Sequence, residues 1–348
     1  LGGRAQGYMT TAHHTGFMLG PGIGGVIIDY LSWRWSFFFL VPIGLCGMLL
    51  TLAGVKRGVS SSHRHAVAID YIGAALVVAT TTTLVLIFDR HTAQIIGARM
   101  KFLLAILFLL SLGGLLFHES RAKSPFIDLS LFKLRLFSLS CVSLLIIASC
   151  YTLTGFLLPF YLQDILHLPP SYIGFLFMLP SILTVAAAPV SGYMTDRFGP
   201  RMPASLGVAV MFFSLMIGSW LRPDSAWWLP TLLIVVGAVT NGIFNPANSM
   251  AMIGMMPREH RGFASAMNHV TFGLGNVLGV SLGGFLMAAA FNYHTGLGSA
   301  SPTAADPLGF VAALNTTFLA AAGLSLVALL TSALRGRHAP TALLKHSL

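Results

Sequence analysis

The sequence has 348 residues, of which 55% are hydrophobic and only 9% are charged, and its mean hydropathy is +0.81. Soluble globular domains carry about 25% charged residues, so this composition excludes that class and indicates a polytopic protein embedded in a lipid bilayer. The formal net charge of +10 is typical of cytoplasmic loops beside anionic lipid. No basic run with interleaved aromatic residues indicates nucleic-acid binding.

Apolar segments long enough to cross a bilayer recur along the whole chain. They predict an all-α fold of about ten transmembrane helices. The expected helices lie at 8–31, 37–54, 70–88, 101–117, 137–159, 171–193, 203–220, 228–251, 263–289 and 308–333. Three longer loops join them, at 56–69, 118–136 and 292–307.

The basic residues fix the expected orientation in the membrane. Fifteen of the 20 Lys and Arg residues fall at the N-terminus, at the C-terminus and in alternate loops, which leaves five for the other loops. The ten acidic residues divide equally and do not discriminate. Because cytoplasmic loops are enriched in Lys and Arg, this bias predicts a multi-pass protein of the cell (inner) membrane with both termini in the cytoplasm.

The first expected helix contains the string Gly-Phe-Met-Leu-Gly-Pro-Gly-Ile-Gly-Gly at 16–25. Gly16, Gly20 and Gly24 are four residues apart and share one helix face, which another backbone can approach closely. Pro21 removes one helix hydrogen bond and favours a bend. Small residues at this spacing are also common in ordinary membrane-helix contacts, so a plain packing role is the alternative interpretation.

A second motif lies in the loop between the sixth and seventh expected helices. It comprises Gly192, Asp196, Arg197, Gly199 and Arg201. A carboxylate at this position can accept hydrogen bonds from helix N-terminal amides and pair with a basic side chain, and a glycine allows a tight turn. These residues are the candidates for a polar contact at the cytoplasmic side, which the family resemblance described below implies is a cytoplasmic latch, and the alternative is an ordinary basic cytoplasmic loop.

Polar side chains lie within two later helices, where exposure to lipid would be costly. In the helix at 228–251, three asparagines at positions i, i+4 and i+7 share one helix face. The helix at 263–289 contains one histidine and two further asparagines. The candidates for a substrate cavity are Asn241, Phe244, Asn245, Asn248, Asn268, His269 and Asn276. A cavity wall and interhelical hydrogen bonding are equally compatible with the three asparagines at 228–251, and a structural role is the alternative for the histidine.

Signatures of catalysis and metal binding are missing from the sequence. It contains no His-Glu-x-x-His motif, no Walker loop and no Gly-x-Ser-x-Gly elbow, so no catalytic residue, metal ligand or cofactor is expected. The pairs His13/His14 and His63/His65 have no carboxylate or thiol close in sequence. No carboxylate falls at a predicted bilayer midplane, because Asp29, Asp70, Asp89, Asp164 and Asp196 all lie near helix ends.

Together these motifs resemble the fourteen-helix drug:proton antiporters of the major facilitator superfamily. Residues 16–25 (Gly16, Gly20, Pro21, Gly22, Gly24 and Gly25) resemble the antiporter motif on helix five of that family, and Trp33-Arg34-Trp35 resembles the entry into helix six. Asp70-Tyr71-Ile72-Gly73 looks like the start of the first linker helix, and 192–201 looks like the loop signature of a facilitator half. In this register the first four helices of the family are absent.

The resemblance implies a partial facilitator fold with three parts. Residues 1–58 would be the remnant of the N-terminal bundle, 59–136 two linker helices with their loops, and 137–348 a C-terminal six-helix bundle with a cytoplasmic tail. It also implies that helix 8–31 packs on 171–193. The glycine ladder Gly275/Gly279/Gly283 would meet an absent helix, so we expect part of 263–289 to face empty space.

The function implied by the resemblance is proton-driven export of small hydrophobic or cationic compounds by alternating access, with no cofactor. A periplasmic adaptor protein is a possible partner in that family. Antiporters of this branch often carry a basic residue early in the helix at 263–289, where Phe272 stands here. Two alternatives stay open: a same-fold exporter of a metabolite or siderophore, and a membrane fragment or scaffold that transports nothing.

Overall fold

The computed structural model describes residues 2–54, 70–88, 90–121, 131–254, 256, 260–296 and 306–335. Within these ranges every regular element is helical, which confirms the all-α fold. The elements are α1 (Gly2–Tyr30), α2 (Trp33–Gly54), α3 (Tyr71–Phe88), α4 (Arg90–Arg121), η1 (Leu131–Lys133), α5 (Arg135–Phe160), η2 (Tyr161–Ile165), α6 (Pro170–Leu176), α7 (Leu179–Phe198), α8 (Arg201–Gly218), α9 (Trp228–Ser249), η3 (Met250–Gly254), α10 (Arg261–Thr295) and α12 (Pro307–Leu334).

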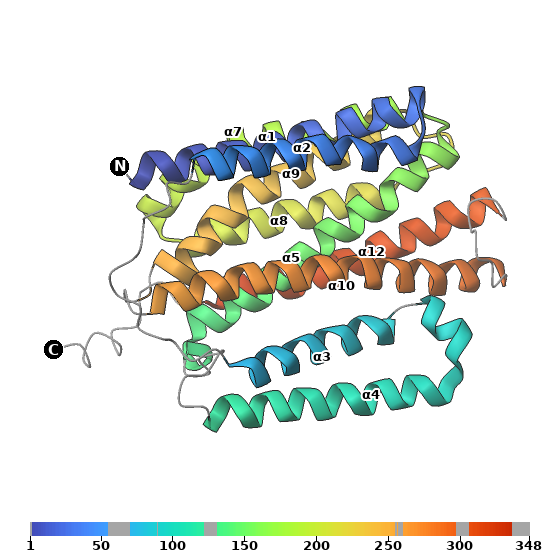
Figure 1. Cartoon of the computed structure of the whole chain (residues 1–348). Helices are drawn as coiled ribbons and strands as arrows, with labels where there is room; N and C mark the ends of the chain where they lie inside the picture. The colour runs from blue at the N-terminus through green and yellow to red at the C-terminus, as the bar shows by residue number, and fades with distance from the viewer. Residues whose placement is uncertain are drawn as a thin grey trace.

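The helices form a central bundle with a helix pair on either side (Figure 1). The bundle consists of α5 to α10 and α12, and it holds the hydrophobic core, whose buried residues all lie between Leu131 and Ala328. The pair α1 and α2 lies along α6 and α7, and the pair α3 and α4 lies beyond α10. None of the residues of α2 is buried, so this helix presents apolar side chains all round, as a membrane helix does.

Each of the ten expected segments coincides with a helical rod, although several ends differ. Eight helices in the described part of the chain are long and apolar enough to span a membrane. The segment expected at 171–193 is two helices, α6 and α7, and α10 continues to Thr295. The expected loop at 56–69 lies outside the described residues. The boundaries proposed at residues 58 and 136 stay predictions.

Two prolines inside helices explain irregular turns near their ends. Pro159 in α5 and Pro246 in α9 each remove a main-chain hydrogen bond, and each is followed within a few residues by a π-helical turn, η2 and η3. We use two names for the ends of the bundle: the Asp196 end holds the turn between α7 and α8, and the Asp29 end is the opposite one.

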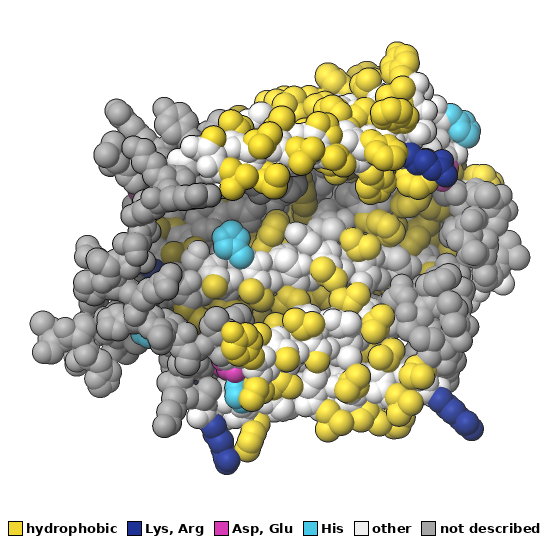
Figure 2. Space-filling model, viewed as in Figure 1, with side chains coloured by type: hydrophobic (Ala, Val, Ile, Leu, Met, Phe, Trp, Pro, Cys, Tyr) yellow, Lys and Arg dark blue, Asp and Glu magenta, His cyan; other side chains and the backbone are white. Residues whose placement is uncertain are grey.

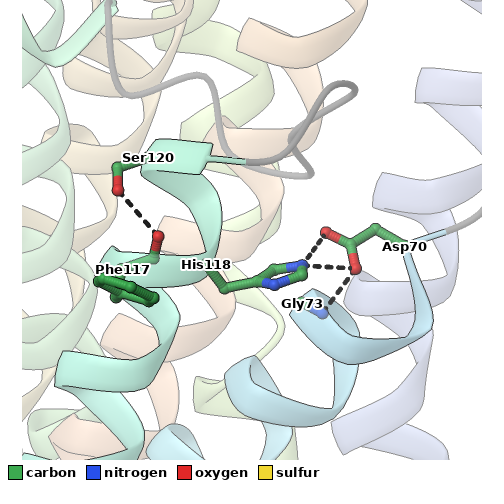
Figure 3. Close-up of polar contacts among 5 residues, drawn as sticks. All are labelled: Asp70, Gly73, Phe117, His118 and Ser120. Atoms are coloured by element: carbon green, nitrogen blue, oxygen red, sulfur yellow. Dashed lines mark hydrogen bonds and ion pairs between the residues drawn. The ribbon is translucent and has the colours of Figure 1, made fainter.

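Helices α3 and α4 are joined by a polar contact where α3 begins (Figure 3). The His118 Nε2 atom lies 2.9 Å from both carboxylate oxygens of Asp70. The Gly73 amide donates to Asp70 Oδ1 at 2.8 Å, and this hydrogen bond, aided by His118, lowers the pKa of Asp70. The same carboxylate therefore caps α3 and ties it to α4.

Candidate functional site

The antiporter-like motif on α1 packs directly on the backbone of α6, which confirms the expected contact between 8–31 and 171–193. A methyl group added at Gly174 would meet the Pro21 carbonyl, with the Pro21 carbonyl carbon at 3.0 Å and the Gly25 Cα at 3.3 Å. A methyl group at Gly25 would meet the Pro170 carbonyl and lie 3.0 Å from the Ser171 Cα. The two backbones touch, and only glycine fits at these points.

The face that makes this contact is not the one expected from the glycine spacing. Gly16, Gly20 and Gly24 have no atom of the described chain within 4 Å of an added Cβ, so this stripe is not the face that contacts α6, and a packing role for it stays a prediction. Gly22 instead lies against the Met178 side chain. Successive residues of a helix are rotated by about 100°, so the packed face at 21, 22 and 25 looks in a different direction from the stripe at 16, 20 and 24.

A cavity of about 270 Å³ lies where Pro21 of α1 meets the bundle helices α5 to α9. Its wall is largely apolar, with hydroxyl-bearing side chains from Tyr151, Thr154, Ser181 and Ser214, and none of the described residues that line it is charged. The hydroxyls of Thr154 and Ser214 donate to main-chain carbonyls at 3.0 and 2.9 Å. Such a cavity suits a small, mostly apolar ligand with few hydrogen-bonding groups.

A larger hollow of about 740 Å³ lies between α1, α2 and α6. Leu19, Ile23, Trp35, Phe38 and Phe175 contribute to its wall, which is almost entirely apolar. Because α2 has no buried residue, this hollow is an open crevice on the surface of the described chain. It is therefore a poorer candidate for a selective site than the smaller cavity.

The expected asparagine face of α9 divides between two environments. Asn245 donates to Asn241 Oδ1 at 3.1 Å. Asn241 and Asn245 are partly exposed, whereas Phe244 and Asn248 are fully buried inside the bundle. None of these four residues lines the 270 Å³ cavity, and the burial of Phe244 and Asn248 inside the bundle contradicts a cavity role for those two.

Asn248 accepts a hydrogen bond from a buried arginine, Arg335, at the C-terminal end of the last helix. The Arg335 side chain is fully buried, its Nη1 donates to Asn248 Oδ1 at 2.8 Å, and its guanidinium lies 5.8 Å from the centre of the Phe244 ring. Burial lowers the pKa of Arg335 to about 10, which still leaves it charged at neutral pH. Its Nε and Nη2 atoms have no partner among the described residues.

The polar residues of α10 mostly join helices rather than line the cavity. Thr152 donates to Asn276 Oδ1 at 2.8 Å, and Asn268 Nδ2 lies 3.4 Å from the Met252 sulfur atom. His269 is exposed. None of these three predicted cavity residues lines the 270 Å³ cavity. A hydrogen-bonding role fits Asn268 and Asn276 better than a cavity role.

The glycine ladder of α10 is occupied, which corrects our expectation of an open contact. Gly279 lies against the Ser149 backbone, Gly275 against Ala148, and Ser149 Oγ donates to the Gly275 carbonyl at 3.0 Å. The ladder therefore packs on α5 of the same bundle. A different face of α10 does lie open, since Val277 and Val280 are exposed, and Figure 2 shows a hollow across the middle of this side of the molecule.

The loop at 192–201 forms the expected tight turn but not the expected ion pair. Gly199 has a φ angle of +76°, in the region that favours glycine. Asp196 is exposed, and in the described part of the chain it makes no ion pair with Arg197 or Arg201. Arg197 instead donates to the Tyr193 hydroxyl at 3.0 Å. The carboxylate of this loop is thus unlatched in this conformation.

The described residues offer little metal chemistry. Among them, no group of three or more His, Cys, Asp or Glu side chains lies close enough together to hold a metal ion. All three cysteines are free thiols, with Cys46 exposed and Cys141 and Cys150 buried.

Comparison with known proteins places these features in a family. Residues 139–346 match the Major Facilitator Superfamily. The chain is 27% identical over 297 residues to the riboflavin transporter RibZ of Clostridioides difficile, 30% over 281 residues to the drug efflux pump JefA of Mycobacterium tuberculosis, and 25% over 321 residues to multidrug resistance protein 3 of Bacillus subtilis.

These matches cover 84%, 77% and 88% of this chain but only 62%, 52% and 61% of the relatives. The chain thus spans between about half and two thirds of the length of the proteins it resembles. The family match extends over most of the bundle described above, from α5 to α12. With eight helices in the described residues that are long and apolar enough to span a membrane, and with this match, the chain belongs to the Major Facilitator Superfamily and is a multi-pass membrane protein.

Proposed function

We propose that the complete protein exports small apolar or cationic compounds by alternating access, driven by the proton gradient. The observation that carries this proposal is the 270 Å³ cavity, which α1 and the C-terminal bundle share. Its apolar wall would hold a compound mainly by burying apolar surface, with hydroxyl groups as adaptable partners. The aromatic faces of Tyr151 and Phe177 would accept a cationic group by cation–π attraction.

The names of two relatives support this substrate class. The Mycobacterium tuberculosis relative is a drug efflux pump and the Bacillus subtilis relative is a multidrug resistance protein. In alternating access, two bundles rock about a central site, so the contact between α1 and α6 would open and close in each cycle.

We further propose that both termini and the Asp196 loop face the cytoplasm, where that loop would act as a latch in another conformation. No cofactor is required, and an adaptor protein would be an additional partner.

Filling the cavity is the direct test. Gly155 borders the cavity, and an added Cβ there meets no atom within 4 Å, so Gly155→Leu would occupy the space without a clash at the backbone. Gly323 on α12 is exposed and equally unobstructed, which makes Gly323→Leu the matched control. We expect dye efflux from cells carrying the complete gene to fall several-fold for the first variant only. Equal efflux by both variants would remove the cavity from the mechanism.

Proton coupling has its own test. Transport of dye into vesicles with an imposed pH gradient should stop when an uncoupler dissipates that gradient. Transport that persists would contradict the proposed driving force.

A second candidate is export of a metabolite, because one relative is a riboflavin transporter. An isoalloxazine ring is planar and largely apolar, so the same cavity chemistry admits it. Competition between riboflavin and dye in the efflux assay separates the two functions. If neither compound moves and no dye binds to the purified protein, the scaffold alternative is favoured.

A further inference from the structure

One hydrogen bond at the Asp29 end joins α1 to the C-terminal bundle across a long stretch of sequence. The Ser171 amide donates to Asp29 Oδ2 at 2.8 Å, and the two residues are 142 positions apart. Ser171 lies in the first turn of α6, so its amide has no partner within that helix. Asp29 lies in the last turn of α1, and its side chain is exposed to solvent.

Other capping carboxylates of the described chain serve neighbouring residues. Asp306 accepts from the amides of Leu308 and Gly309, and Asp70 accepts from the amide of Gly73, in the helices that these acids immediately precede. Asp29 differs because it caps a helix of another part of the fold. Its hydrogen bond must break if α1 and α6 separate.

The packing behind this hydrogen bond suits a contact that opens and closes. Gly25 and Gly174 bring the two backbones together with no side chain interposed, so they can part without unlocking interdigitated side chains. Such a contact buries little side-chain surface, and it depends more on polar interactions to stay closed.

We propose that Asp29 is a positioning residue that forms a clasp: its carboxylate holds α1 against the Ser171 amide and stabilises the state in which the Asp29 end is closed. The inference rests on the proposed alternating-access function. The clasp works on the end of the bundle opposite the Asp196 loop, so releasing it favours conformations that are open at the Asp29 end.

The test measures conformation rather than transport. In the complete protein, with every native cysteine replaced by alanine, spin labels at Tyr30→Cys and Trp220→Cys would report the distance between the end of α1 and the end of α8. Both side chains are well exposed, at 82% and 67%, so labels there do not disturb packing. The measurement is made in lipid nanodiscs for the labelled parent protein and each variant.

We expect Asp29→Ala to increase the population with the longer distance by about three- to tenfold, as loss of one exposed charge-assisted hydrogen bond allows. Asp29→Asn keeps a side-chain carbonyl acceptor and should fall between the parent and Asp29→Ala. Asp224→Ala removes an exposed acid from the loop between α8 and α9 and should leave the distances unchanged.

Three outcomes would overturn the clasp: an unchanged distance distribution in Asp29→Ala, an equal shift in Asp224→Ala, or an Asp29→Asn variant as open as Asp29→Ala. The last two would indicate an effect of surface charge rather than of the hydrogen bond. Failure of the proposed function is distinguishable, because it would appear as absent efflux by the wild-type protein whatever the distances show.

Discussion

Replacing Gly174 by alanine would place a methyl group in direct conflict with the backbone of α1. The added carbon would meet the Pro21 carbonyl and lie 3.0 Å from its carbon atom and 3.3 Å from the Gly25 Cα. Carbon atoms pack best at about 3.5–4.0 Å, so the two helices must separate by roughly 0.5–1 Å. The conflicting atoms belong to a backbone, which cannot rotate away as a side chain can. Overpacking of this kind costs about 1–3 kcal/mol.

Gly20→Ala provides the matched control on the same pair of helices. An added Cβ at Gly20 meets no atom within 4 Å, so alanine relieves the low helix propensity of glycine, by about 1 kcal/mol, without a clash. The two substitutions add the same methyl group, yet their effects on stability should have opposite signs.

The assay is thermal unfolding of the purified complete protein, together with dye efflux by cells that express each variant. We expect Gly174→Ala to lower the unfolding temperature and reduce efflux, and Gly20→Ala to raise the unfolding temperature slightly and retain efflux. If Gly20→Ala is the damaging variant, the stripe at 16, 20 and 24 carries the contact and the face assigned here is wrong. If neither variant has an effect, the close contact between α1 and α6 does not exist in the membrane.

Three further predictions concern other parts of the molecule. Asn248→Leu leaves the buried Arg335 guanidinium without its hydrogen-bond acceptor and should destabilise the protein by roughly 3 kcal/mol in chemical denaturation. Adding Arg335→Met should restore most of that stability. If the effects of the two substitutions simply add, the two residues are not paired. Because the pKa of Asp70 is lowered, its carboxylate contributes its full stabilisation above about pH 4 and loses it as the pH falls through the folded-state pKa. His118→Ala should raise the folded-state pKa of Asp70 toward 3.8, which NMR titration would measure. An unchanged pKa would contradict the contact between His118 and Asp70. Asp224→Cys should react with an impermeant thiol reagent outside intact cells, and labelling only after lysis would reverse the proposed orientation.

The positions of the helices could be predicted from the sequence because the signals are local and strong. Apolar runs of membrane-spanning length mark each expected helix, whereas the contact of α1 with α6 was expected only from the family resemblance. The face of that contact could not be predicted, because glycines occupy both sides of α1 and a difference of one residue turns the face by about 100°. Nothing in the sequence of α1 shows that Gly174 is opposite Pro21.

The polar interior was harder to predict, because burial depends on how the helices assemble. Arg335 directly follows an apolar run, so its charge suggested a cytoplasmic loop, yet the bundle encloses its side chain next to Asn248. The asparagine spacing indicated a shared face of α9, but it did not show that Asn248 is fully buried while Asn241 is partly exposed. Asn241 and Asn248 lie seven residues apart, yet Asn241 hydrogen-bonds with Asn245 on the same helix, whereas Asn248 hydrogen-bonds with Arg335 at the end of α12.

The position of Pro21 connects the cavity to the contact between α1 and α6. Its carbonyl lies against Gly174, and the same residue forms part of the wall of the 270 Å³ cavity. One rigid helix therefore borders the site that would hold the transported compound and the contact that would close the Asp29 end. A compound that displaces Pro21 also pushes on the backbone contact at Gly174, and release of the Asp29 clasp moves the wall of the cavity. Because both sites bias the same element, occupancy of the cavity and closure of the Asp29 end are expected to be coupled in both directions.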